Sequence, residues 1–168
     1  MNTILITGSN RGIGLELVRQ YADDNWHVLA CCRSPKDASA LQELAGSKDN
    51  ISVHALDVSN SQQITALASE LKDTTIDILF NNAGIYGPYD ANFGNTDGQQ
   101  WLECFSINTI SPMKVTEAFV NHVANRQLKT VASMSSKMAS MADNGSGGSY
   151  LYRSSKAALN AVMTSAAI

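Results

Sequence analysis

A tyrosine and a lysine stand four residues apart late in the 168-residue chain, at Tyr152 and Lys156. On a helix this spacing places both side chains on one face. A tyrosine hydroxyl in water keeps its proton up to about pH 10, and a fixed ammonium beside it favours the phenolate. The pair is therefore suited to passing a proton to or from a carbonyl oxygen. An isolated pair also arises by chance on amphipathic helices, but none of the other tyrosines has a lysine four residues later.

Three glycines follow the first apolar run and precede the first amphipathic stretch. The segment reads Thr7-Gly8-Ser9-Asn10-Arg11-Gly12-Ile13-Gly14. A helix N-terminus offers free N–H groups and a partial positive charge, and glycine lets phosphate approach the backbone. The context between strand and helix favours a dinucleotide site over a plain tight turn. The Lys-Ser/Thr of a nucleoside-triphosphate loop is absent, which argues against a kinase or NTPase.

The elements that must position these residues alternate between strand-like and helix-like patterns. Strands are predicted at Thr3–Thr7, His27–Cys32, Ile51–Leu56, Ile76–Asn81 and Leu128–Met134. Helices are predicted at Ile13–Asp24, Pro35–Ala45, Ser61–Lys72 and Asp97–Asn125, with a last one from about Tyr150. Strands joined by crossover helices form a parallel sheet. The prediction is an α/β fold with a Rossmann-type doubly wound sheet, in a single domain over residues 1–168.

The glycine spacing resembles the short-chain dehydrogenase/reductase family, whose turn reads TGxxxGxG. The resemblance continues in order through Asn81-Asn82-Ala83-Gly84 after the fourth strand, Ser135-Ser136 after the fifth, and Tyr152 with Lys156 on the last helix. It extends over essentially the whole chain and is nearest to carbonyl-reductase-like and C-factor-like members. It implies hydride exchange between a nicotinamide cofactor and a carbonyl compound or its alcohol.

The resemblance also implies a catalytic set of four residues: Asn108, Ser136, Tyr152 and Lys156. Ser136 is expected to hydrogen-bond the substrate oxygen, with Ser135 as its close competitor. The family uses the position of Asn108 to kink the long helix and hold a relay water. Pro112 also interrupts helical bonding, so a purely structural kink is the alternative.

The end of the second strand indicates which dinucleotide is bound. An acid there binds the 2′-hydroxyl of NAD, whereas arginine pairs with the 2′-phosphate of NADP. The strand leads into Arg33, and Arg11 can add a second charge, so NADP(H) is expected; the alternative is two solvated arginines. Asp57 and Val58 resemble the family's adenine-contacting pair, although Asp57 alone reads equally as the start of a helix. The expected cofactor-binding residues are Gly8, Ser9, Asn10, Arg11, Gly12, Ile13, Gly14, Arg33, Asp57, Val58, Asn82, Ala83, Gly84, Tyr152 and Lys156.

Composition narrows the class of protein. Twelve Lys and Arg against fifteen Asp and Glu give a net charge of −3, without the basic stripe of a nucleic-acid-binding protein. No apolar run approaches the roughly 20 residues of a membrane span, and no signal peptide is evident. Three cysteines and three scattered histidines suit neither a disulfide framework nor a metal site. These features predict a cytoplasmic protein without nucleic acid, membrane or metal, and the family resemblance implies a small-molecule substrate, a carbonyl compound or its alcohol.

The C-terminal end looks incomplete beside the family. A full dinucleotide fold has six strands, whereas five are visible, and the last helical pattern still runs at Ile168. We therefore expect the family's C-terminal portion to be missing. The resemblance implies a homodimer or homotetramer built through the long fourth helix and the last helix. The alternatives to a working reductase are an NADPH-binding module with little turnover, detectable by blue cofactor fluorescence, and an assembly protein.

Overall fold

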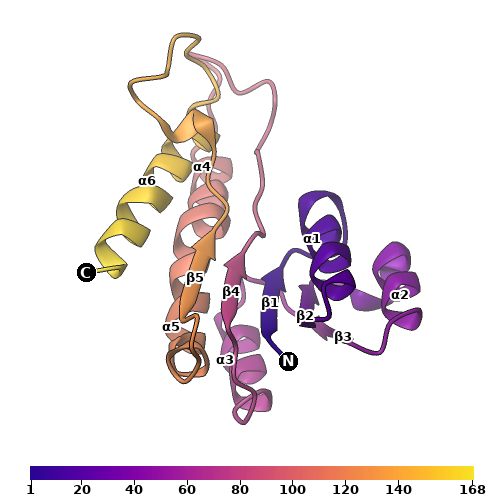
Figure 1. The fold of residues 1–168 in the computed structure, drawn as a ribbon. Coiled ribbons are helices and arrows are strands. Elements are labelled where there is room, and N and C mark those ends of the chain that lie inside the picture. Colours follow the sequence, from indigo (N-terminus) through magenta and orange to yellow (C-terminus); the bar gives the residue numbers. More distant parts are fainter. The chain divides into compact units, whose positions relative to one another are not determined.

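The computed structural model describes every residue, Met1–Ile168, and forms two compact units. Unit 1 comprises Met1–Ala83 and Lys114–Met134, and unit 2 comprises Gly84–Met113 and Ser135–Ile168. Figure 1 shows the helices and strands that make up each of them. A single domain over 1–168 stays a prediction.

Unit 1 is built on a five-stranded parallel sheet. Its strands are β1 (Thr3–Thr7), β2 (His27–Cys32), β3 (Ile51–Ala55), β4 (Ile78–Asn81) and β5 (Thr130–Ser133), in the order β3-β2-β1-β4-β5. In the register, β1 pairs on one side with β2 and on the other with β4, Ile4 lying opposite both Val28 and Ile78. This order confirms the predicted Rossmann-type fold.

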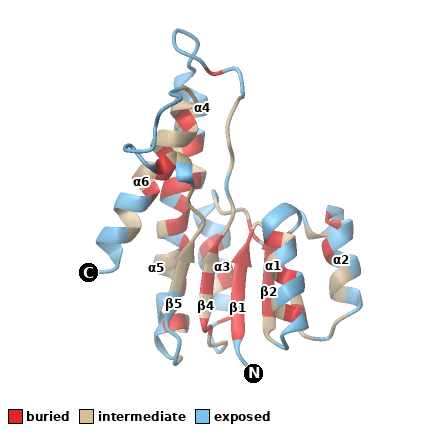
Figure 2. Ribbon diagram, turned by 45° about the horizontal axis from the view of Figure 1, so that its top comes forward, coloured by how far each residue is buried: buried red, intermediate tan, exposed pale blue.

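Helices cover both faces of this sheet. On one face Ile4 and Ile6 pack with α1 (Gly12–Asp23) and α2 (Ser39–Gly46). On the other face Leu5 packs with α3 (Ser61–Glu70) and with Phe119 of α5 (Ser111–Ala124). Every residue of β1 is therefore buried, as its colour shows in Figure 2, which is typical of a parallel sheet covered on two sides.

Most strand bounds fall within one or two residues of the prediction. The helix predicted over Pro35–Ala45 differs more, because a 3₁₀ turn over Pro35–Asp37 precedes α2. Ala38 separates the two with φ −90° and ψ 64°, which lies outside the helical region. The proline sits in the first turn, where its missing N–H costs no bond.

Unit 2 contains α4 (Gly98–Phe105), a π-helical turn (Ser106–Ile110), the start of α5, a 3₁₀ turn (Lys137–Ala139) and α6 (Tyr150–Ala166). The single helix predicted over Asp97–Asn125 is therefore interrupted. The N–H of Ser111 donates to the carbonyl of Ser106, five residues back. Pro112 has no N–H with which to restore the ordinary bond to the carbonyl of Asn108. The last helix ends at Ala166, short of the predicted run to Ile168.

A small apolar cluster holds α4 and α6 together within unit 2. Cys104 and Leu151 are buried side by side in it, and Trp101 packs against them. The indole N–H of Trp101 also donates to the Ser154 hydroxyl at 2.8 Å. None of the helices in the protein combines the length and the apolar character that crossing a membrane requires.

Candidate functional site

The turn between β1 and α1 requires glycine at three positions. Gly8 and Gly12 have φ of +69° and +56°, a region that residues with a side chain rarely adopt. A Cβ on Gly8 would lie 2.9 Å from Cα of Ala83. A Cβ on Gly14 would lie 2.3 Å from the Gly8 carbonyl oxygen and 2.5 Å from Nδ2 of Asn82. The turn can thus be this tight only with glycine.

The segment after β4 holds this turn in shape. The Thr7 hydroxyl oxygen accepts the backbone N–H groups of Asn82 at 3.1 Å and Ala83 at 3.0 Å. The Asn82 amide in turn donates to the carbonyls of Thr7 at 2.9 Å and Gly8 at 3.1 Å. Asn82 and Ala83, predicted to bind cofactor, are therefore brought to the glycine turn. Thr7 was not among the predicted site residues, although a hydroxyl directly before the first glycine is a usable signal.

The other residues of the turn differ in exposure. Ser9 is buried and its hydroxyl donates to the Ile6 carbonyl at 2.7 Å, whereas Asn10, Arg11 and Ile13 are exposed. Arg11 is the N-cap residue of α1, and its side chain makes no capping hydrogen bond. The first-turn N–H groups of α1 are thus left without a side-chain partner, which suits a phosphate.

Arg33, Asp57 and Val58 follow the ends of β2 and β3. Asp57 accepts the N–H and the hydroxyl of Ser59 at 2.9 and 2.7 Å. These bonds, with the nearby Arg33 charge, lower the pKa of Asp57 below its ordinary value. The N-cap of α3 is Asn60, so reading Asp57 as the residue that caps that helix is wrong. Arg33 is exposed, and Val58 packs against the apolar core of unit 1.

Tyr152 and Lys156 lie in unit 2, one helical turn apart on α6. The ammonium nitrogen of Lys156 is 5.9 Å from the centroid of the Tyr152 ring. Lys156 is only 4% exposed, and this burial lowers its pKa from the ordinary value of a lysine. A buried cation beside the ring of a half-buried tyrosine is an arrangement suited to proton transfer at the phenol oxygen.

Asn108 lies in the π-helical turn and is fully buried. Its side-chain oxygen accepts the N–H of Ile85 at 2.9 Å, and its amide donates to the Ile85 carbonyl at 2.8 Å. The same amide donates to the Ser155 hydroxyl at 2.9 Å. Ser155 in turn donates to the Tyr152 carbonyl at 2.8 Å. Asn108 therefore connects the π-helical turn to the part of α6 that carries the tyrosine and the lysine.

The two serines after β5 have different partners. Ser135 donates its hydroxyl to Oδ1 of Asn160 at 2.6 Å. Ser136 instead accepts the N–H of Met138 at 3.1 Å, which leaves its O–H able to donate to another oxygen. The 3₁₀ turn that follows packs on α6, where Arg153 donates to the Met138 carbonyl at 3.3 Å. Of the two serines, Ser136 is the better donor for a substrate oxygen.

Tyr86, which is not among the predicted site residues, stacks on Tyr152 with ring centroids 4.7 Å apart. Its hydroxyl and that of Ser149 lie 2.7 Å apart. The ring of Tyr89 stacks on Tyr86 at 4.9 Å. The only signal in the sequence is an aromatic residue two positions after Asn-Asn-Ala-Gly.

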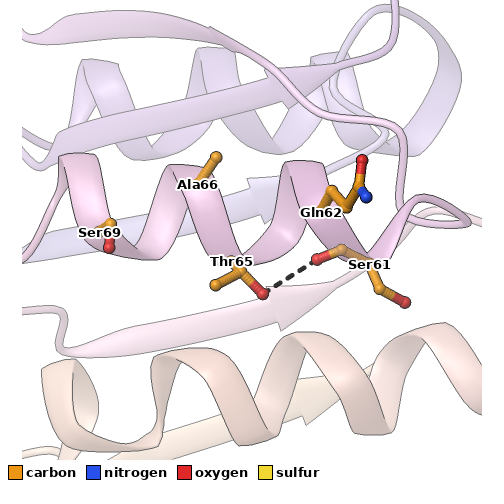
Figure 3. Close-up of a pocket in the computed structure, with 5 residues that line it drawn as sticks. All are labelled: Ser61, Gln62, Thr65, Ala66 and Ser69. Atoms are coloured by element: carbon orange, nitrogen blue, oxygen red, sulfur yellow. Dashed lines mark hydrogen bonds between the residues drawn. The ribbon is translucent and has the colours of Figure 1, made fainter.

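Unit 1 has two hollows, and none of the predicted site residues lines either of them. One is on the exposed side of α3, where Thr65 donates to the Ser61 carbonyl at 3.0 Å (Figure 3). It contains no charged side chain. The other is near Asp77 and Arg126, which already form an ion pair at 2.8 Å.

Cysteine and histidine side chains are dispersed through the protein. Cys31, Cys32 and Cys104 are buried and not in disulfides, and burial raises the pKa of each thiol. No group of three or more His, Cys, Asp or Glu side chains is arranged to hold a metal ion. The predicted catalytic residues carry hydroxyl, amide and ammonium groups.

The sequence matches the short chain dehydrogenase family over residues 2–168. An uncharacterized oxidoreductase of Schizosaccharomyces pombe is 33% identical over 165 residues, a match that covers 94% of this chain and 63% of the relative. The chain thus spans less than two thirds of that relative's length.

Solved structures at a similar level of identity share the fold. A carbonyl reductase from Pseudomonas aeruginosa in complex with NADP is 33% identical with a TM-score of 0.88, over 98% of this chain and 74% of that one. An NADPH-bound carbonyl reductase from chicken fatty liver is 32% identical with a TM-score of 0.88, over 96% and 68%.

Proposed function

The chain belongs to the short chain dehydrogenase family, and we propose that it is an NADP(H)-dependent oxidoreductase that interconverts a carbonyl compound and its alcohol. One observation carries this proposal: the buried Lys156 lies beside the ring of Tyr152 on a helix tied to Asn108. Burying a charged ammonium costs free energy, and a buried lysine that nevertheless lies beside a tyrosine ring is typical of a functional site.

The glycine turn fits the pyrophosphate of a dinucleotide. Gly12 has open space where a Cβ would stand, and the first turn of α1 has no side-chain cap. Residues of the turn and of Asn82-Ala83-Gly84 would hold the cofactor, and Asp57 with Val58 would contact its adenine. When bound, the nicotinamide supplies the hydride. The carbonyl reductases with bound NADP or NADPH support this assignment.

Two arginines favour NADP(H) over NAD(H). Arg33 follows β2 where an acid would bind the 2′-hydroxyl of NAD. The positive charge of Arg33 helps to lower the pKa of Asp57, so the guanidinium lies close to the residues proposed for adenine. Arg11 is exposed at the start of α1 and can add a second positive charge. A 2′-phosphate would make charge-assisted hydrogen bonds with such groups.

In the direction of reduction, Tyr152 would give its hydroxyl proton to the carbonyl oxygen as the alcohol forms. Lys156 stabilises the phenolate left behind. The O–H of Ser136 would donate to the same oxygen and stabilise its developing charge. Asn108 holds α6 in place through Ser155, and the π-helical turn that contains it is the proposed place of a relay water.

We also propose a homodimer or homotetramer. Leu102 of α4 and Ile110 of the π-helical turn are 64% and 53% exposed, and apolar side chains at such levels of exposure are suited to a subunit interface. Light scattering of the purified protein would give the mass. A monomer at micromolar concentration would contradict this assignment. A cytoplasmic location stays a prediction.

The test is a titration of the purified protein with NADPH and separately with NADH. It follows blue cofactor emission, and then absorbance of the nicotinamide with a panel of aldehydes and diketones. Tighter binding of NADPH together with turnover is the expected result. Tight binding without turnover would support the cofactor-binding module instead. Binding of neither cofactor would overturn the proposal.

A further inference from the structure

Tyr86 is held between two fixed neighbours in a segment without regular secondary structure. Ile85 before it exchanges two hydrogen bonds with the buried side chain of Asn108. Gly87 after it has φ +82°, and a Cβ there would lie 2.9 Å from Sγ of Cys104. Only glycine fits such a position. The backbone on both sides of Tyr86 therefore fixes where its side chain emerges.

The side chain of Tyr86 makes two contacts with α6 and its N-cap residue. Its ring stacks on that of Tyr152, with centroids 4.7 Å apart and planes 30° from parallel. Its hydroxyl lies 2.7 Å from that of Ser149, the N-cap residue of α6. Ser149 has φ +47°, and its side chain makes no capping bond to the helix. The hydroxyl of Ser149 thus serves the contact with Tyr86.

A third ring extends this stack outward. Tyr89 lies 4.9 Å from Tyr86 with planes 22° from parallel, and it is 88% exposed. It has no ring contact with Tyr152. Tyr86 is therefore the ring through which the segment after Gly84 touches the proton-transfer tyrosine, and Tyr89 serves as an internal comparison.

We infer that Tyr86 is a positioning residue that holds the side chain of Tyr152 in place; this inference rests on the proposed function. The phenol oxygen must stay within hydrogen-bond reach of the substrate oxygen in the transition state. A side chain that swings about its Cα–Cβ bond would spend less time in that geometry. Tyr86 stacks on the ring of Tyr152, and the centroid of the Tyr152 ring lies 5.9 Å from the Lys156 ammonium. Tyr86 thus acts on kcat through Tyr152 and not through cofactor binding.

The experiment compares kcat and KM for the wild type, Tyr86→Leu, Tyr86→Phe and Tyr89→Leu. Aromatic pairs contribute about 0.5–1.5 kcal/mol, which corresponds to a fall in kcat of about 2- to 12-fold at 1.36 kcal/mol per tenfold. Tyr86→Leu should show this fall with KM for NADPH unchanged. Tyr86→Phe keeps the ring and should stay within about twofold of the wild type. Tyr89→Leu, the matched control, should do the same because it leaves the ring on Tyr152 in place.

Tyrosine-labelled NMR provides a readout that does not need turnover. The ring signals of Tyr152, identified by their loss in Tyr152→Phe, should move in Tyr86→Leu and stay in place in Tyr89→Leu. Unmoved signals, or an unchanged kcat in Tyr86→Leu beside an inactive Tyr152→Phe, would overturn the inference alone. An equal fall in Tyr86→Phe would also overturn it, because the effect would then belong to the hydroxyl. If Tyr152→Phe has the same kcat as the wild type, the proposed function itself is contradicted, because Tyr152 then does not transfer the proton.

Discussion

The side-chain amide of Asn108 donates to the hydroxyl of Ser155 at 2.9 Å, one residue before Lys156. This bond joins a π-helical turn to the helix that carries the proton-transfer pair. π-helical turns within α-helices are frequent at functional sites. Here the turn contains a buried asparagine whose side chain makes three hydrogen bonds, one of them to the residue before Lys156.

The first prediction concerns that residue. Asn108→Leu should lower the free energy of unfolding by roughly 3 kcal/mol, because it leaves the buried polar partners of the amide unsatisfied. The matched control is Asn125→Leu, an exposed asparagine whose amide bonds one carbonyl within α5. It should change stability by about 0.5 kcal/mol or less. Urea unfolding measures both, and equal losses would contradict the anchoring role of Asn108.

The alternation of apolar strands and amphipathic helices was enough to predict the sheet of unit 1. The glycine turn could also be predicted, because local conformation and close approach require glycine at Gly8 and Gly14. The stack of Tyr86 on Tyr152 could not be predicted in this way. It joins two segments far apart in the sequence, and Tyr86 lies in a stretch whose conformation depends on Asn108 and Cys104. No periodic pattern encodes such a contact.

The second prediction tests the close packing of the glycine turn. Gly14→Ala puts a Cβ 2.3 Å from the Gly8 carbonyl oxygen, so the turn must move. The free energy of unfolding should fall by about 2 kcal/mol and NADPH should bind more weakly. Gly46→Ala is the control, since nothing lies within 4 Å of its Cβ position and its φ is not positive. That variant should be neutral or slightly more stable in thermal unfolding. Similar destabilisation of both variants would contradict the packing argument.

The third prediction concerns the choice of dinucleotide. Arg33→Asp replaces the group proposed to hold the 2′-phosphate with one that repels it. NADPH should bind at least about tenfold more weakly, since a hydrogen bond to a charged group contributes about 1.5–3 kcal/mol, while binding of NADH should hold or improve. Lys72→Asp makes the same change of charge at an exposed lysine just past α3. Fluorescence titrations of both variants measure the affinity for NADPH. A similar loss of affinity in each would show that net charge, and not a specific contact of Arg33, causes the effect.

The fourth prediction is a pH dependence that arises from Lys156. Burial lowers the pKa of this lysine below 10.5, so the folded state binds fewer protons there than the unfolded state. Its contribution to stability is therefore present above pH 10.5 and is lost as the pH falls through the lowered pKa. The buried thiols, whose pKa values are raised above 9.0, act in the opposite direction.

Comparison of variants separates these two effects. The rise in stability with pH should be smaller in Lys156→Met than in the wild type, and Lys114→Met should leave it unchanged because Lys114 is exposed. Urea unfolding at a series of pH values provides the measurement. Parallel stability curves for Lys156→Met and the wild type would show that Lys156 titrates as an ordinary lysine.

The proton-transfer role of Tyr152 is tested most directly by the rate of NADPH oxidation with a reactive aldehyde or diketone, measured in Tyr152→Phe and Tyr150→Phe. Both variants lose one hydroxyl from the same helix, and Tyr150 belongs to the apolar cluster of unit 2. Tyr152→Phe should still bind NADPH, because the glycine turn is unchanged, and should lose at least about 100-fold in turnover, the lower range for a general acid. Tyr150→Phe should retain turnover. Full activity in Tyr152→Phe would contradict the central claim that this hydroxyl transfers the proton.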